Sequence, residues 1–197
     1  NSLTSLLASV EFLNDMKLDE NAFSLVENIQ QSTLNLQKLV SDMMDITRVE
    51  MDSLVIDCQR VDTNRIIEDL SKAVKPLAIK RRQTVLLEIN KPLPMVMADE
   101  DRTRQVLLNL LDNASKFTPG GGIITIGAQV YQDCLKIYVK NTGKGIKPEE
   151  IPFIFDLYYT HRSEAGHMSG MGIGLSLSKV LVEKQGGKIW VENVPGK

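Results

Sequence analysis

The residues best suited to chemistry lie in one stretch, residues 104–118, which reads RQVLLNLLDNASKFT. At about 100° per residue on a helical wheel, its two asparagines fall on one polar face beside an apolar arc. That polar face consists of Gln105, Asn109, Asp112, Asn113 and Lys116. Asparagine suits the middle of a helix poorly, because its side chain competes for backbone hydrogen bonds. Two amide oxygens beside a cation suit a hard metal such as Mg²⁺, which often binds substrate phosphates; the alternative is a polar surface that happens to contain asparagine.

Two glycine-rich segments follow this asparagine helix. Residues 141–146 read NTGKGI after a strand-like run, and residues 170–175 read GMGIGL at the start of an apolar helical run. Glycine permits close backbone approach and positive φ, and the amide groups at a helix N-terminus suit anions. Either segment alone is more often a tight turn than a nucleotide site, so their order after residues 104–118 carries the interpretation.

In this order and spacing, the three segments resemble the N, G1 and G2 boxes of sensor histidine kinases, and residues 153–159, FIFDLYY, resemble the F box. The resemblance extends over nearly the whole chain. It implies an ATP-binding domain of the type shared by histidine kinases, DNA gyrase and heat-shock chaperones, with ATP and Mg²⁺ as cofactors. No G-x-x-x-x-G-K-[ST] motif occurs, so ATP is not expected to be held by a P-loop.

The resemblance also implies roles for single residues. Asn113 matches the Mg²⁺-coordinating asparagine, and Asn109 matches the supporting contact one turn earlier. Lys116 would reach toward the phosphates and Phe117 would lie against the nucleotide, so that phosphoryl transfer depends on positioning and charge neutralisation. The other nucleotide contacts that the resemblance implies are Asn141, Gly143, Gly145, Ile146, Tyr159, Gly170, Met171, Gly172, Ile173, Gly174 and Leu175.

Residues 160–169, THRSEAGHMS, take the place of the mobile lid over ATP in this family. A lid is useful because it excludes water and gates phosphoryl transfer. Thr160 stands where relatives often have a basic residue that contacts the γ-phosphate, and Arg162 is the predicted catalytic substitute. The alternative for Arg162 is a solvated loop arginine. We interpret His161 and His167 as exposed lid residues rather than metal ligands.

Three departures from the family pattern concern the acceptor, the base and the last strand. The family carries its phosphorylated histidine in a motif like H-E-x-R-T-P-L, and Asn1–Leu3 resemble the residues just after it. We therefore expect an excised fragment without the acceptor. Asn141 replaces the aspartate that accepts a hydrogen bond from the adenine amino group. Lys197 falls where the family continues into one more strand, which predicts a truncated sheet.

The region before the ATP-binding segments is predicted to be helical. Two amphipathic runs, over residues 2–16 and 21–50, are joined by a short polar turn and predict an antiparallel hairpin. Its apolar face is too broad for a lone hairpin, so a second copy is expected across it. The resemblance favours this dimeric four-helix bundle. The alternative is a hairpin packed on its own neighbouring domain.

From residue 53 onward, strands mixed with helices predict a two-layer α+β sandwich with one face of its sheet covered. Strands are predicted over residues 54–56, 85–89, 123–126, 135–139 and 188–194, and helices over 63–80, 104–118 and 175–185. Asp99 is the predicted N-cap of the asparagine helix. We therefore expect a dimerisation hairpin at 1–52 and an ATP-binding domain at 53–197.

The composition is that of a globular protein of 197 residues, with 43% hydrophobic and 24% charged residues. A formal net charge of −2 provides no basic surface for nucleic acid. Cys58 and Cys134 lack metal-like spacing, and we interpret them as small apolar residues in or beside strands. No apolar run approaches the roughly 20 residues that cross a bilayer. This part of the protein is therefore expected in the cytoplasm, and membrane anchoring of a longer parent protein stays open.

The leading hypothesis is the dimerisation and ATP-binding part of a two-component sensor histidine kinase. It would phosphorylate a hairpin histidine with ATP, for transfer to an aspartate of a response-regulator receiver domain. A second hypothesis is a related ATPase of the same superfamily, against which the hairpin before the nucleotide domain argues. A third is a degenerate kinase that acts as a signalling scaffold, which Asn141 and Thr160 keep open. The expected partners are ATP or ADP, a second copy of the chain and a response regulator.

Overall fold

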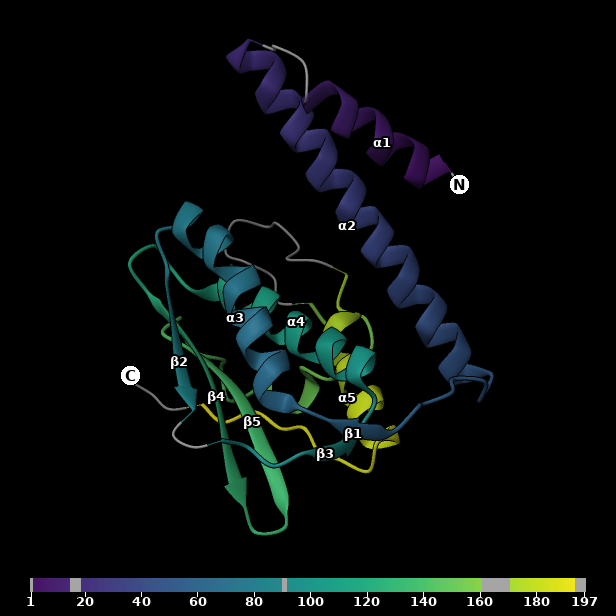
Figure 1. Cartoon of the computed structure of the whole chain (residues 1–197), viewed down its shortest axis with the longest axis vertical. Coiled ribbons are helices and arrows are strands. Elements are labelled where there is room, and N and C mark those ends of the chain that lie inside the picture. Colours follow the sequence, from purple (N-terminus) through teal and green to yellow (C-terminus); the bar gives the residue numbers. More distant parts are fainter. Residues whose placement is uncertain (1, 15–18, 90–91, 161–170, 194–197) are drawn as a thin grey trace. The chain divides into compact units, whose positions relative to one another are not determined.

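The computed structural model describes residues 2–14, 19–89, 92–160 and 171–193. It separates into two compact units, Asn1–Leu54 and Val55–Lys197 (Figure 1). The domain boundary that we predict from the sequence, between residues 52 and 53, lies close to this division.

The N-terminal unit is a pair of helices, α1 (Ser2–Asn14) and α2 (Glu20–Glu50), which contact each other. Asp19 caps α2, because its carboxylate accepts a hydrogen bond from the backbone amide of Ala22 at 2.7 Å. Val10 of α1 and Val26 of α2 are buried. The helical hairpin expected from the sequence is therefore present.

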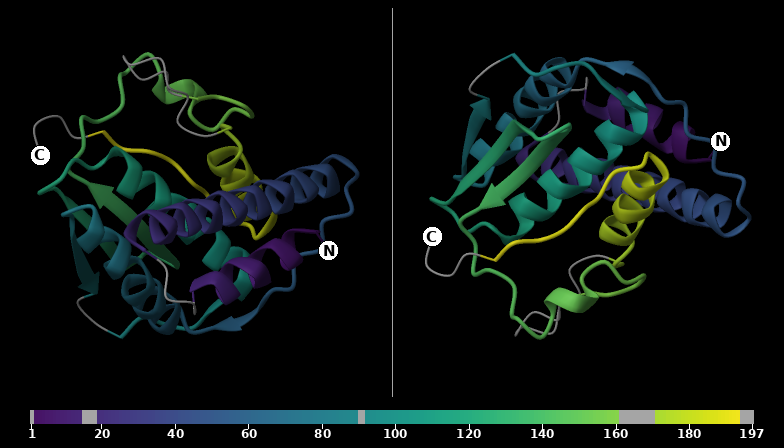
Figure 2. Two further views of the ribbon diagram at one scale, coloured as in Figure 1. Left: turned by 90° about the horizontal axis from the view of Figure 1, so that it is seen from above. Right: turned by 90° about the horizontal axis from the view of Figure 1, so that it is seen from below.

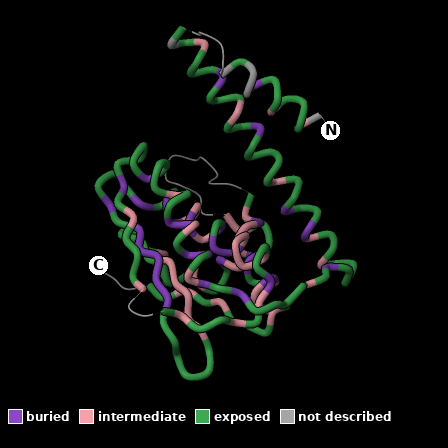
Figure 3. The backbone as a smooth tube through the Cα atoms, viewed as in Figure 1, coloured by how far each residue is buried: buried purple, intermediate pink, exposed green. Residues whose placement is uncertain are grey.

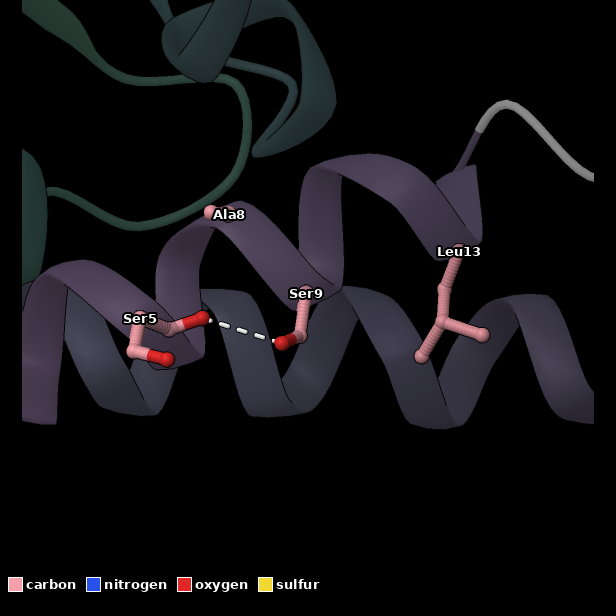
Figure 4. A pocket seen from close by; sticks show the side chains of 4 residues that line it. All are labelled: Ser5, Ala8, Ser9 and Leu13. Carbon is pink, nitrogen blue, oxygen red and sulfur yellow. Dashed lines mark hydrogen bonds between the residues drawn. The ribbon is translucent and has the colours of Figure 1, made fainter.

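Many apolar side chains of α2 nevertheless remain exposed. These exposed α2 side chains are Phe23, Leu25, Ile29, Leu34, Leu36, Val40, Met43 and Met44. On α1, Ser5, Ala8, Ser9 and Leu13 line an open hollow, in which the Ser9 hydroxyl donates a hydrogen bond to the Ser5 carbonyl at 3.0 Å (Figure 4). Within the N-terminal unit, α1 thus leaves much of the apolar surface of α2 uncovered.

The C-terminal unit contains two sheets. Strand β1 (Gln59–Val61) pairs antiparallel with β3 (Val96–Ala98). The larger sheet has the order β2 (Thr84–Ile89), β4 (Ile123–Tyr131) and β5 (Cys134–Asn141). Strand β2 runs parallel to β4, and β4 runs antiparallel to β5. Since a parallel pair cannot be joined by a tight hairpin, the chain crosses from β2 to β4 through β3 and a helix.

Helices α3 (Thr63–Lys80) and α4 (Glu100–Phe117) cover one face of the larger sheet, and α5 (Gly174–Lys184) packs against α4 (Figure 1 and Figure 2). Figure 3 shows buried segments where these layers meet. The buried core residues are Val61, Ile66, Ile67, Leu70, Leu107, Leu111, Ala114, Ile124, Ile126 and Ala128. The two-layer α+β fold expected from the sequence is confirmed.

Aspartates cap both of the helices that cover the sheet. Asp99 accepts a hydrogen bond from the backbone amide of Arg102 at 3.0 Å, which confirms the predicted cap of α4. Asp62 accepts hydrogen bonds from the amides of Asn64 at 3.0 Å and Arg65 at 3.4 Å. A bond from the Asn64 side chain, together with that from the Arg65 amide, lowers the pKa of the Asp62 carboxyl. Short polar signals therefore fix where both helices begin.

Two predicted strands are wrong. Residues 54–56 take no regular structure, and the first strand begins at Gln59, because the three-residue β3 supplies a partner only from there. Residues 188–193 also form no strand and run as an extended segment without regular structure (Figure 2). Residue 194 lies outside the described residues. Side chains hold this last segment in place of a ladder, for example Lys136 Nζ, which is 3.3 Å from Glu192 Oε1.

Candidate functional site

Asn109 joins the two helices that are expected to hold the nucleotide. It lies in the middle of α4 and is only 3% exposed. Its amide nitrogen donates to the Gly174 carbonyl and to the Ser178 hydroxyl of α5, both at 3.4 Å. The Ser178 hydroxyl in turn donates to the Gly174 carbonyl at 2.7 Å. The side chain of Asn109 is therefore buried and links α4 to α5 by hydrogen bonds.

The C-terminal half of α4 carries the other predicted ligand contacts. Asn113 is half-buried, one turn after Asn109. Lys116 Nζ lies 2.8 Å from Asp112 Oδ2, and these two side chains are 37% and 34% exposed. Phe117, the last residue of α4, is 45% exposed. An amide, an ammonium group and an aromatic ring thus remain within reach of a ligand along this end of the helix.

Gln83 holds the end of α4 in place, a role that the sequence did not suggest. Its side-chain nitrogen donates to the carbonyls of Ser115 at 2.8 Å and Thr118 at 2.6 Å. The Ser115 hydroxyl donates to the Gln83 amide oxygen at 3.0 Å and accepts from Arg81 Nη1 at 2.9 Å. Because the last carbonyls of a helix lack partners within it, this buried amide fixes the turn that contains Lys116.

The G1-like segment begins at the end of β5 and packs against the end of α4. The backbone amide of Thr142 donates to the Ile123 carbonyl at 3.0 Å, and the Thr142 hydroxyl accepts from the Ile123 amide at 2.8 Å. A Cβ atom at Gly143 would clash with the Phe117 carbonyl oxygen and would lie 2.7 Å from the side-chain nitrogen of Asn141. Glycine therefore allows the G1-like and N-box-like segments to touch.

The F-box-like segment surrounds the central glycine of the G2-like segment. It contains the short 3-10 helix η1 (Ile151–Phe153), and the rings of Phe153 and Tyr159 stack with their centroids 6.4 Å apart. The Tyr158 amide donates to the Gly172 carbonyl at 3.0 Å. Gly172 has a φ of +68°, and a Cβ atom there would clash with the backbone of Tyr158 and Tyr159. Both the conformation and the contact require glycine.

Tyr159 is a half-buried phenol at the edge of the predicted lid. Loss of solvent raises the pKa of Tyr159, and the carboxylates of Glu150 and Glu149 raise it further. The hydroxyl therefore stays protonated to a higher pH than that of an ordinary tyrosine, and in that form it can donate a hydrogen bond. Thr160, where relatives often have a basic residue, is half-buried as well.

The start of helix α5 has no side-chain cap in the part of the chain that the structure describes. The helix begins at Gly174, and its N-cap residue Ile173 provides no side-chain hydrogen bond to the first turn. Ile173 is buried, Leu175 is half-buried and Met171 is 48% exposed. Amide groups at the start of a helix favour an anion. The G2-like segment therefore presents backbone donors at the helix end that Asn109 holds.

Some predicted residues cannot be placed against this geometry. Arg162 and Gly170 lie outside the described residues, as do His161 and His167 of the predicted lid. Within the described ranges, no group of three or more His, Cys, Asp or Glu side chains could hold a metal ion. Among those same residues, no helix combines the length and the apolar character that a membrane span requires.

Comparison with known protein families agrees with this geometry. Residues 98–197 match the family described as histidine kinase-, DNA gyrase B-, and HSP90-like ATPase, which is just over half of the chain. The chain belongs to this family. Helices α4 and α5, strands β4 and β5 and the glycine-rich segments between them all lie within the matched residues of this ATPase domain.

Curated relatives that are similar to this chain include a respiration control sensor protein and a sensory kinase. The aerobic respiration control sensor protein ArcB homolog of Haemophilus influenzae is 32% identical over 185 residues, which cover 93% of this chain and 57% of that protein. The adaptive-response sensory kinase SasA of Thermosynechococcus vestitus is 32% identical over 207 residues, which cover 100% of this chain and 54% of that protein. This chain therefore spans about half the length of these relatives.

Solved histidine kinases share its fold. Full-length ShkA in complex with AMPPNP aligns with a TM-score of 0.73 and 25% identity, covering 98% of this chain and 41% of that chain. The catalytic domain of histidine kinase ThkA aligns with a TM-score of 0.62 and 29% identity, covering 70% of this chain and 88% of that chain. The helical region followed by an α+β ATPase domain is thus the architecture of known histidine kinases.

Proposed function

We propose that this chain binds Mg²⁺–ATP in residues 53–197 and donates the γ-phosphoryl group to a histidine on a dimerisation hairpin, for relay to a response-regulator aspartate. The observation that carries the proposal is the contact among the family boxes. Asn109 bonds to Gly174 and Ser178, and Gly143 packs on Phe117. One ligand at the end of α4 could therefore meet the N-, G1- and G2-like segments together.

The donor set suits Mg²⁺. The Asn113 amide supplies a neutral oxygen on a half-buried turn, and the described residues contain no cluster of acidic or histidine side chains that would bind an ion by itself. Mg²⁺ keeps several waters and is commonly held by one or two protein oxygens together with substrate phosphates. Asn113 would therefore hold the ion, whose charge would offset that of the phosphates.

Cationic and backbone groups would bind the phosphates. Lys116 would leave its ion pair with Asp112, which is partly exposed and therefore inexpensive to break. The amides of Gly172, Ile173 and Gly174 would face the same charge at the start of α5. Arg162, which is predicted to contact the γ-phosphate from the lid, would complete this set. The donors would stabilise the charge of the transferring group, which is the main requirement of phosphoryl transfer.

The base would lie between the G1-like segment and the aromatic residues. Asn141 ends β5 and is exposed, so its amide oxygen could accept a hydrogen bond from the adenine amino group. Phe117 and Tyr159 would offer rings to the base, and Gly143 brings the backbone of the loop close to Phe117. These positions would bind the nucleoside part of ATP, with Gly145, Ile146, Met171 and Leu175 as further contacts.

The exposed α2 side chains would pair with a second copy of the chain. A four-helix bundle buries the broad apolar face that a single hairpin leaves open. In the reaction, an imidazole nitrogen of the hairpin histidine would bond to the γ-phosphorus. The bond between the γ-phosphorus and the β,γ-bridging oxygen would break at the same time, which releases ADP. ThkA, whose catalytic domain is similar to this chain, has also been solved with the response regulator TrrA, and a response regulator would receive the phosphoryl group here as well.

Calorimetric titration with ADP and ATP, with and without Mg²⁺, tests the proposed site. Asn113→Ala should abolish the Mg²⁺-dependent part of binding, since it removes the only amide oxygen assigned to the ion. Asn35→Ala, which removes an exposed amide from α2, is the matched control and should bind like the parent. Undiminished Mg²⁺-dependent binding in Asn113→Ala would refute the assignment of the metal ligand.

Labelling with γ-labelled ATP tests the proposed reaction. The only histidines of the chain, His161 and His167, lie in the predicted lid. The chain alone should therefore stay unlabelled, and a homologous hairpin that carries the acceptor histidine should become labelled in its presence. Acid-labile phosphate on the chain itself would contradict the assignment. Nucleotide binding without any labelling of the hairpin would favour a signalling scaffold.

A further inference from the structure

Asn193 binds the end of the G1-like segment through both atoms of its side-chain amide. The Ile146 amide donates to Asn193 Oδ1 at 3.3 Å, and Asn193 Nδ2 donates to the Ile146 carbonyl at 2.8 Å. A side-chain amide that accepts from and donates to one residue makes the same two bonds that a neighbouring strand would make. One side chain thus joins the segment 188–193 to the end of this loop by two hydrogen bonds.

This pair of bonds fixes the end of the loop that the sheet does not hold. At the other end, Asn141 is paired with Ile124 in the ladder between β5 and β4. The segment between Asn141 and Ile146 contains two glycines and therefore has little stiffness of its own. The position of the base-binding backbone consequently depends on a support at each end, the β4 ladder and the Asn193 amide.

Gly145 provides the space for this contact. It has a φ of +75°, and a Cβ atom at this position would lie 2.7 Å from Asn193 Oδ1. Any side chain there would push the Asn193 amide away from Ile146. The contact between Asn193 and Ile146 therefore requires glycine at position 145, whether or not a nucleotide is bound.

The segment that carries Asn193 is itself attached to β5. The Trp190 indole donates to Glu192 Oε1 at 2.8 Å, and Lys136 Nζ lies 3.3 Å from the same oxygen. Lys136 Nζ also lies 5.0 Å from the centroid of the Trp190 ring, within the range of a cation–π contact. These contacts lower the pKa of the Glu192 carboxyl, the Trp190 bond most and Lys136 next. The segment that carries Asn193 is thus held against β5 through Lys136.

From this geometry we infer that Asn193 is a positioning residue for adenine binding. It sets the distance of the Asn141–Ile146 backbone from the base without touching the nucleotide. The inference rests on the proposed function, because it assumes that this loop binds the base. It assigns a role in nucleotide affinity to a residue that lies 47 positions after the loop it holds.

The test compares two asparagines with the same bonding pattern. Asn64 Nδ2 donates to the Leu93 carbonyl at 3.1 Å, and its Oδ1 accepts from the Leu93 amide at 3.0 Å. Asn64→Ala is therefore the matched control, since it removes the same pair of bonds, together with one from Asn64 to Asp62, from residues with no predicted nucleotide contact. Asn193→Ala should weaken Mg²⁺–ATP binding about tenfold by calorimetry, the equivalent of one or two hydrogen bonds. Asn64→Ala should bind ATP as the parent does.

Two further variants separate positioning from a general loss of structure. Asn193→Asp keeps the size of the side chain but turns an oxygen toward the Ile146 carbonyl, so it should weaken ATP binding about as much as Asn193→Ala. Asn141→Asp should no longer tighten ATP binding once Asn193→Ala is also present, because coupled residues are not additive. Parent-like ATP affinity in Asn193→Ala or Asn193→Asp would overturn the inference. Additive effects with Asn141→Asp would overturn it too.

The outcome is distinguishable from failure of the proposed function. If the parent chain binds no Mg²⁺–ATP, the proposed function is wrong, and the ATP affinities of the variants cannot be compared with that of the parent. Hydrogen exchange of the Ile146 amide then still measures the bond itself, and this amide should exchange faster in Asn193→Ala than in the parent. Unchanged exchange would show that Asn193 does not hold the loop.

Discussion

The two glycine-rich segments of the site differ in what surrounds their glycines. In the G1-like segment, a Cβ atom added at Gly143 would meet the Phe117 carbonyl at the end of α4, and one added at Gly145 would meet the Asn193 side chain. In the G2-like segment, Gly172 meets two consecutive peptide groups, and Gly174 has only an ordinary contact of 3.6 Å with the Asn109 amide. Glycine is thus required by close packing at Gly143, Gly145 and Gly172, whereas position 174 has space for a larger residue.

This difference separates a rigid part of the site from an adjustable one. Backbone atoms cannot move aside without disturbing the elements that contain them, whereas a side chain can change its rotamer. The G2-like segment is fixed at Gly172 by backbone atoms, while the second glycine of the G1-like segment, Gly145, is bounded by a side chain. Base recognition should therefore tolerate change better than the conformation around Gly172 does.

Gly172→Ala should be the most damaging substitution in the site. It combines a positive φ with clashes against the backbone of Tyr158 and Tyr159, which we expect to lower the free energy of unfolding by about 2–4 kcal/mol. Denaturant unfolding measures this change. Gly121→Ala is the control, because Gly121 has a φ of +83° and open space around it, so only the conformational part should remain. Equal losses in the two variants would show that the contact with the tyrosines is unimportant.

Gly143→Ala should come next. It clashes with the Phe117 carbonyl but has no positive φ, so overpacking alone should destabilise the chain by about 1–3 kcal/mol. ATP affinity should also fall about tenfold, because the loop must move away from the end of α4. Calorimetry measures the affinity. Gly120→Ala, with its closest contact at 3.6 Å, should change neither quantity, and the same loss in both variants would contradict the close approach at Gly143.

Asn141→Asp should strengthen ATP binding by about 1 kcal/mol, or several-fold in affinity, because a charged acceptor makes a stronger hydrogen bond than an amide does. It should also weaken GTP binding, since a carboxylate has no donor for the guanine oxygen. Competition between ATP and GTP measures both effects. Weaker ATP binding in this variant would mean that Asn141 does not read the base.

Gly174→Ala should have the smallest effect on stability. A Cβ atom there makes ordinary contact with Asn109, and alanine favours the first turn of α5 by about 0.5–1 kcal/mol over glycine. The free energy of unfolding should therefore change by no more than about 1 kcal/mol in denaturant titrations. A loss as large as that of Gly172→Ala would contradict the ordinary contact between residue 174 and Asn109.

Elements with local signals could be predicted from the sequence. The start of α3 and the cap of α4 at Asp99 follow from residues within one turn of each helix start. Family motifs also indicated which segments would meet, and Asn109, Gly174 and Gly143 do lie at such contacts. The roles of these residues toward a nucleotide stay predictions.

Features that depend on distant partners could not be predicted. Gln83 supports Ser115 and Thr118, more than 30 positions later, and nothing in its neighbourhood marks it as buried. Residues 188–193 contain three consecutive apolar residues, Ile189 to Val191, that favour a strand, but a strand also needs a partner with free hydrogen-bonding groups. Here the Asn193 side-chain amide bonds to Ile146 instead, and nothing near Asn193 in the sequence indicates this contact.

The position of α4 between β2 and β4 links the proposed chemistry to the order of folding. Thr84 pairs with Ile123 and Ile89 with Ala128, so the central parallel pair can close only around a loop that contains α4. Closing such a loop costs conformational entropy before any ladder contact is gained, whereas a helix forms much faster from local contacts. One face of α4, with Leu107 and Leu111, is therefore tied to the rate of folding. The other half of the helix surface, with Asn113 and Lys116, is free to vary for ligand binding without slowing the assembly of the sheet.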